Sequence, residues 1–217
     1  RKDLANILLH IKSKPEPSLI YLSTNALILS QDNNLRHRLY DSVDVFGLSL
    51  DGSSAAMNIK MGRVPTHMRA NREFVRQVSI EMPGKPVKVG TIVSAINRND
   101  VVKTGEVIQT WSYETPFNLI AWRLFQFSPV EEGYDNRHSY EISNDDFNDT
   151  LAHTESILPN INVVPRPNTT AENAYFLVLP TGEMALSKTG IHQPITEPII
   201  SLTSEKLSSV IDQHSET

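Results

Sequence analysis

Four short apolar runs, each ending in small or polar residues, constrain the fold of this chain more than any other feature of its sequence. The runs span residues 18–23, 43–50, 87–96 and 119–130. Their ends carry Thr24-Asn25, Asp51-Gly52, Asn97 and Ser128. Segments with helical periodicity separate the runs, and such an alternation predicts right-handed βαβ units with a parallel sheet. We therefore expect an α/β fold, either an open doubly wound sheet or part of a barrel. Because several runs are apolar at nearly every position, we also expect strands buried on both faces.

Helix signals occupy the segments between these runs. Leu4, Ile7, Leu8 and Ile11 follow the period of one apolar helical face, so the chain opens within an amphipathic helix. Candidate N-caps precede three later helices: Asp32, Ser53 or Ser54, and Ser143 with Asp146 at the third helical position. Further helices are predicted over residues 67–82 and 100–114.

The composition becomes more polar after residue 130. The helix that follows Ser143 is succeeded by extended segments, and residues 175–186 predict a hairpin with Thr181-Gly182 in its turn. Residues 204–217 predict a terminal helix. We expect two parts, a barrel core at 1–150 and an extension with the hairpin and terminal helix at 151–217.

Composition excludes several classes of protein. With 39% hydrophobic and 21% charged residues, the chain resembles ordinary globular proteins rather than disordered ones. A net charge of −5 argues against a broad nucleic-acid surface. No apolar run approaches the length of a membrane span and no signal pattern is visible, so we expect a cytoplasmic protein. There is no cysteine, which excludes thiolate metal ligands within these residues.

The polar strand ends are the main purely physical indication of a site, because the carboxyl ends of parallel strands line ligand sites in α/β folds. Arg63 follows one such end and could hold a carboxylate or phosphate. Asp51 with Glu131 and Glu132 could form an acid pair, although capping and solvated loops explain these residues equally well. The seven scattered histidines do not indicate a metal site, and no phosphate-binding loop or nucleophile motif is present.

Five pieces of sequence, taken in order and spacing, resemble strands three to six of the radical S-adenosylmethionine (SAM) enzymes, and among these the viperin-like group. They are STNALIL (23–29), VDVFGLSLDG (43–52), MGR (61–63), VKVGTIVSAINRND (87–100) and WRLFQFSPVEEG (122–133). The resemblance covers roughly residues 1–150. It implies a partial (β/α)6 barrel, a [4Fe–4S] cluster and SAM, whose cleavage yields a 5′-deoxyadenosyl radical that abstracts hydrogen from a substrate.

The resemblance also implies site residues. SAM would be bound by Asn25, Ser49, Arg63, Ser94, Asn97 and Gln126. The substrate, a small molecule or nucleotide, would contact Arg123. The resemblance identifies neither the substrate nor a catalytic residue. The viperin-like group has Lys and Asn on strand five where this chain has Thr91 and Val93, and one of its two basic residues on strand six is replaced here by Ala121.

In the family, a C-x-x-x-C-x-x-C cluster loop and a Gly-Gly-Glu motif precede the matched region. We therefore expect a truncated radical SAM chain that lacks its first strands, binds no cluster and is inactive by itself; a parent that never had the cluster is the other interpretation. The alternative functions are a non-catalytic α/β domain that binds a nucleotide or metabolite, and a partner-binding module. An exposed barrel edge could also support a dimer.

Overall fold

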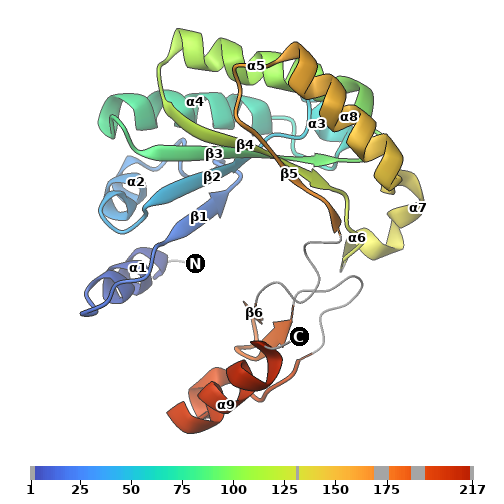
Figure 1. The fold of residues 1–217 in the computed structure, drawn as a ribbon. Coiled ribbons are helices and arrows are strands. Elements are labelled where there is room, and N and C mark those ends of the chain that lie inside the picture. The colour runs from blue at the N-terminus through green and yellow to red at the C-terminus, as the bar shows by residue number, and fades with distance from the viewer. Residues whose placement is uncertain (1–2, 131, 169–175, 187–193, 216–217) are drawn as a thin grey trace.

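The structure is a computed structural model that describes residues 3–130, 132–168, 176–186 and 194–215. Its centre is a five-stranded sheet in which β1 to β5 lie side by side in chain order, every pair parallel (Figure 1). The strands are β1 (Tyr21–Thr24), β2 (Val45–Ser49), β3 (Pro86–Val93), β4 (Asn118–Gln126) and β5 (Val163–Arg166). The predicted parallel α/β fold is confirmed.

The helices decide between the two expected architectures. The longer ones are α1 (Leu4–Lys12), α2 (Asn33–Tyr40), α3 (Ala55–Lys60), α4 (His67–Glu81), α5 (Val101–Glu114) and α8 (Asn144–Ile157). Shorter turns are η1 (Arg98–Asp100), α6 (Glu132–Asp135) and α7 (Arg137–Tyr140). Right-handed crossovers that always step in one direction place their helices on one face, and Figure 1 shows α4, α5 and α8 together above the sheet. A doubly wound sheet would need a reversal of strand order, so this is the arrangement of part of a barrel; the described strands do not close one.

Three predicted caps begin their helices as expected. The side chain of Asp32 accepts a hydrogen bond from the amide of Leu35 at 2.8 Å. Ser54, rather than Ser53, accepts one from Met57 at 3.1 Å, and Ser143 accepts one from Asp146 at 3.1 Å. Each cap satisfies an amide that the first helical turn leaves without a partner.

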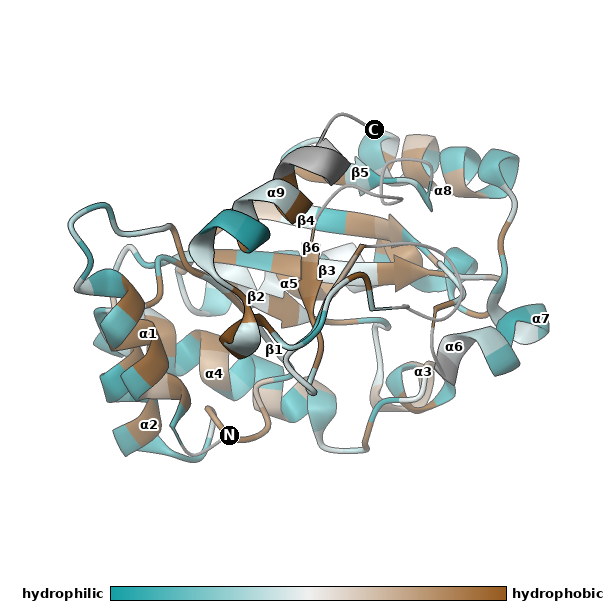
Figure 2. Cartoon of the chain, turned by 90° about the horizontal axis from the view of Figure 1, so that it is seen from below, coloured by the Kyte–Doolittle hydropathy of each residue, from teal (hydrophilic) through white to brown (hydrophobic). Residues whose placement is uncertain are grey.

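The two faces of the sheet differ, and the expectation that both are buried is wrong. On the helix-covered face the side chains are fully or almost fully buried: Phe46, Leu48, Val87, Val89, Val93, Trp122 and Leu124. The alternate positions carry Ser49, Lys88, Ile92 and Arg123, which remain partly exposed. The charged residues Lys88 and Arg123 therefore share the second face of the sheet with apolar residues such as Ile92. Figure 2 views the molecule from this second side, which we call the open face.

The C-terminal part carries the predicted hairpin and terminal helix. Strands β6 (Phe176–Val178) and β7 (Met184–Leu186) pair antiparallel, and Gly182 takes a positive φ of 92° in the turn between them; Tyr175 lies outside the described residues. Turn η3 (Ile199–Ser201) and helix α9 (Ser204–Ser215) follow. In Figures 1 and 2 these elements lie beneath the open face. Since β5 belongs to the sheet, the sheet continues past residue 150, and the division of the chain there stays a prediction.

Among the described residues, no helix has the length and apolarity needed to cross a membrane.

Candidate functional site

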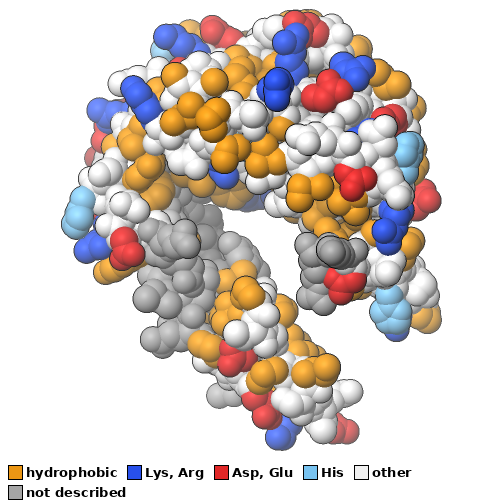
Figure 3. All heavy atoms as spheres, turned by 180° about the vertical axis from the view of Figure 1, so that it is seen from behind, with side chains coloured by type: hydrophobic (Ala, Val, Ile, Leu, Met, Phe, Trp, Pro, Cys, Tyr) orange, Lys and Arg blue, Asp and Glu red, His pale blue; other side chains and the backbone are white. Residues whose placement is uncertain are grey.

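A cleft of about 1000 Å³ opens on the open face, toward the carboxyl ends of the strands. Figure 3 shows the molecule hollowed here, between the helix-covered sheet and the C-terminal part. The residues that line the cleft are Tyr21, Ser23, Leu48, Ser49, Asp51, Arg63, Gly90, Ile92, Arg123, Phe125, Gln126, Phe127, Ser128, Val130, Gly133, Arg166, Pro167 and Asn168. All five strands contribute, which agrees with the predicted site at the strand ends.

Four of the predicted site residues meet in this cleft: Ser49, Arg63, Arg123 and Gln126. Asn25 is exposed just after β1 and its side chain accepts a hydrogen bond from Leu27 at 3.2 Å. Neither Asn25, Ser94 nor Asn97 lies on the cleft lining.

Ser94 and Asn97 are buried within the loop that leaves β3. The Asn97 carboxamide accepts a hydrogen bond from the Ser94 amide at 2.8 Å and donates to the carbonyls of Asp51 at 2.9 Å and Ile92 at 2.7 Å. These bonds tie the end of β3 to the loop after β2. Ser94 and Asn97 thus fix the positions of these strand ends without lining the cleft themselves.

Gln126 lies on the lining, but its amide is engaged inside the protein. It donates to the side chain of Asn144 at 2.9 Å and to the carbonyl of Ile142 at 3.2 Å, and it accepts from the amide of Asn168 at 3.1 Å. Gln126 therefore joins the end of β4 to the start of α8 and to the loop after β5.

A buried ion pair stands at the carboxyl end of β2. Arg63 donates from Nε to one carboxylate oxygen of Asp51 at 2.6 Å, and the amide of Ile92 donates to the other oxygen at 2.8 Å. The Asp51 side chain is 2% exposed and that of Arg63 is 28% exposed. The structure thus pairs Asp51 with Arg63; Glu131, and the side chain of Glu132, lie outside the described residues, so the suggested acid pair is untested.

His67 supports the same strand end from α4. Its Nε2 lies 2.7 Å from the Ser49 carbonyl, to which Asn71 also donates at 2.9 Å, so this nitrogen carries the proton of a neutral ring. Burial lowers the pKa of His67 below its ordinary 6.5, and the positive charge of the nearby Arg63 lowers it as well. The hydrogen bond to Ser49 raises the pKa but does not outweigh these two effects.

We expect the stability of the protein to depend on pH through His67. Because the pKa is lower in the folded state, the unfolded chain takes up a proton first; stability is fully present above the unfolded pKa of 6.5 and is lost as pH falls toward the folded value. Urea unfolding from about pH 7.5 to 5.5 should show a larger loss in the natural protein than in His67→Gln, which keeps a donor for Ser49. Parallel pH curves for the two proteins would contradict this role.

Sequence reasoning missed two basic residues of the open face, Lys88 and Arg166. Thr91 and Val93, which stand where the viperin-like group has Lys and Asn, point to the helix-covered face: Thr91 donates to the Leu50 carbonyl at 2.6 Å and accepts from Trp122 at 2.9 Å. Lys88 lies two positions before Gly90 and so shares the open face with it. Counting period two back from Ile92 would have found it.

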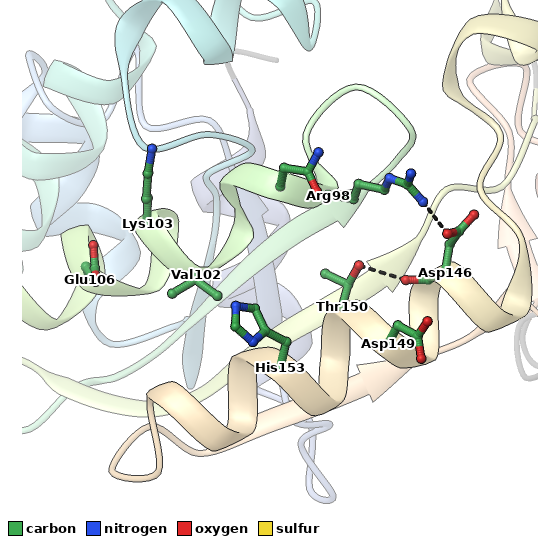
Figure 4. A pocket seen from close by; sticks show the side chains of 9 residues that line it. Arg98, Val102, Lys103, Glu106, Asp146, Asp149, Thr150 and His153 are labelled. Atoms are coloured by element: carbon green, nitrogen blue, oxygen red, sulfur yellow. Dashed lines mark hydrogen bonds and ion pairs between the residues drawn. The ribbon is translucent and has the colours of Figure 1, made fainter.

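A second hollow, of about 470 Å³, lies between α5 and α8 (Figure 4). Arg98 pairs with Asp146 there, while Lys103 and Glu106 lie on α5 and Asp149 and His153 on α8. Thr150 donates to the Asp146 carbonyl at 2.7 Å. The hollow shares no lining residue with the cleft. The described residues contain no group of three or more potential metal ligands.

Comparison with known proteins concerns the fold. No family model matches the sequence, and no curated protein matches it. The solved structure of a domain of pyruvate-formate lyase-activating enzyme from Bacteroides vulgatus ATCC 8482 is similar, with a TM-score of 0.53 and 9% sequence identity. The likeness covers 76% of this chain and 89% of that chain. At this identity it shows a shared fold and no more.

Proposed function

We propose that this chain forms the SAM-binding and substrate-binding part of a cytoplasmic radical SAM enzyme. The observation that carries the proposal is the cleft at the carboxyl ends of a parallel sheet whose strands run in chain order. The similar solved structure, an activating-enzyme domain of the radical SAM family, supports it. The viperin-like subgroup, and a truncated chain, rest on the sequence resemblance alone.

The cleft residues suit SAM. Within the part of the chain that the structure describes, Arg63 uses only Nε for Asp51, so its Nη groups are free to bind the carboxylate of the methionine part. Ser49 offers a hydroxyl for the ribose, while Phe125 and Ile92 provide apolar walls. In this proposal Gln126, Ser94 and Asn97 hold the end of the cleft in shape, and Asn25 borders it after β1.

An iron–sulfur cluster does not fit the residues of this chain. None of its 217 residues is cysteine, so it offers no thiolate ligand. The proposal therefore assigns this chain binding roles only and requires cluster ligands from outside this sequence. A dimer through the edge of β1 stays a further prediction.

SAM binding is tested by calorimetry of this chain with SAM. Ile92 is 36% exposed on the open face, so Ile92→Trp should obstruct the cleft while the fold is kept. Ile80→Trp is the matched control, because Ile80 is 64% exposed on α4 and does not line the cleft. We expect the natural chain and Ile80→Trp to bind SAM alike and Ile92→Trp to bind about tenfold or more weakly, a loss of roughly 1.4 kcal/mol.

Absence of SAM binding, or equal binding by all three proteins, would overturn the proposal. The catalytic part is tested on the complete gene product, reconstituted anaerobically with iron and sulfide, by the formation of 5′-deoxyadenosine. SAM binding without any such product would instead indicate a non-catalytic binding domain.

A further inference from the structure

Three basic side chains lie on the open face of three neighbouring strands. Arg123 pairs with Gly90, two residues after Lys88, and Arg166 pairs with Phe125, two residues after Arg123. Lys88, Arg123 and Arg166 therefore lie on a diagonal across β3, β4 and β5. Each step joins α-carbons roughly 8 Å apart, from the strand spacing and the rise of two residues. Side chains as long as those of Lys and Arg can converge from such positions on one small group.

Tyr21 approaches the same place from β1. Its hydroxyl lies over Gly47 of β2, where a β-carbon would be only 2.1 Å from the oxygen, so glycine is what lets the ring cross that strand. The ring centroid is 5.2 Å from Cζ of Arg123 and 5.6 Å from Nζ of Lys88. The face of the Tyr21 ring thus attracts both cations and adds no charge to the cluster.

In the part of the chain that the structure describes, no carboxylate is paired with these cations. Among the described residues, none of the three forms an ion pair, and the acid on the cleft lining, Asp51, is paired with Arg63. Burial lowers the pKa of Lys88, and the charges of Arg123 and Arg166 lower it further, which places all three within electrostatic reach of one another. An acidic chain of net charge −5 therefore concentrates mutually repelling cations on its open face, and two of them, Arg123 and Arg166, line the cleft.

We propose that Lys88, Arg123 and Arg166, with Tyr21, bind a phosphate group of the substrate. The assignment of this phosphate to a substrate rests on the function proposed above, whereas the anion site itself is inferred from the positions of the four side chains. A phosphate dianion presents several oxygens in different directions, which suits cations arriving from three strands, whereas one carboxylate presents two oxygens in a plane. Arg63 lines the same cleft but is paired with Asp51 and is not one of the three cations of this site.

The test uses inorganic phosphate, glycerol 3-phosphate, glycerol and succinate with this chain. We expect both phosphates to bind, glycerol not to bind, and succinate to bind more weakly. The double variant Lys88→Gln/Arg123→Gln should weaken phosphate binding about 30-fold or more, because it removes two charge-assisted contacts. The control Arg69→Gln/Lys103→Gln makes the same change of net charge at exposed positions that do not line the cleft, and it should bind as the natural chain does.

A second measurement needs no variant. In the natural chain, saturating phosphate should raise the lowered pKa of Lys88, measured by NMR. Tighter binding of succinate than of phosphate, equal loss in the two double variants, or an unmoved Lys88 would overturn the proposal. Because SAM binding is measured independently with Ile92→Trp, failure of the phosphate site can be told apart from failure of the proposed function.

Discussion

Arg63→Ala should lower the free energy of unfolding by about 3 kcal/mol, because it leaves a buried carboxylate without its cation. The Asp51 side chain is 2% exposed and would keep only the amide of Ile92 as the described donor to its carboxylate. The remaining charge lies at the end of β2 and lines the cleft, so SAM binding should be lost together with stability. Urea unfolding gives the first quantity and calorimetry the second.

Two further variants separate the burial of this charge from the loss of a side chain. Asp51→Asn in the Arg63→Ala background removes the unpaired charge and should restore more than half of the lost stability. Arg72→Ala breaks an ion pair whose side chains are 62% and 45% exposed, and it should cost about 0.5 kcal/mol or less. If Arg63→Ala were as mild as Arg72→Ala, the ion pair would not be what holds this strand end.

Glu81→Ala should be at least as damaging, with an expected loss of about 3–5 kcal/mol, because it strands a buried guanidinium. Arg36 is 1% exposed and donates to both carboxylate oxygens of Glu81 at 2.7 Å. Its other donors reach the Leu29 carbonyl at 2.6 Å and the Asn33 side chain at 2.7 Å, so the guanidinium joins α2, α4 and the turn after β1.

The matched control is Glu114→Ala, since Glu114 also pairs with an arginine but on the surface. It should change the denaturation midpoint little, by about 0.5 kcal/mol or less. The Arg36 hydrogen bond lowers the pKa of Glu81, so the advantage of the natural protein over Glu81→Ala should be present above the unfolded pKa of 4.5 and shrink as pH falls below it. An effect equal to that of Glu114→Ala would show that the burial of Arg36 is not energetically important.

These two ion pairs have different consequences for function. The Arg36–Glu81 pair fastens helices on the outside of the sheet, so Glu81→Ala should reduce ligand binding only as far as it unfolds the protein. The Asp51–Arg63 pair stands in the cleft, so its loss should impair binding even in molecules that remain folded. Comparing binding per folded molecule in the two variants separates a residue of the site from a residue of the scaffold.

The sequence by itself determined what depends on neighbours along the chain. Asp32 and Ser143 begin helices as predicted because a cap and its partner are three residues apart, and Thr181-Gly182 forms its turn because glycine accepts positive φ. The alternation of strands and helices was enough to predict a parallel sheet with polar strand ends, and therefore a site at those ends.

Only the tertiary structure decided which residues face that cleft. Period two in the sequence places Lys88 on the same face as Ile92, but only the packing shows that helices cover the opposite face and leave this one open. Ser94, Asn97 and Gln126 are polar residues at strand ends, as a ligand site requires, yet their amides and hydroxyls find partners inside the protein. The partners of Asn97 and Gln126 include the Asp51 carbonyl, 46 positions away, and the Asn168 amide, 42 positions away, which only packing brings beside them, and no local pattern encodes such a distance.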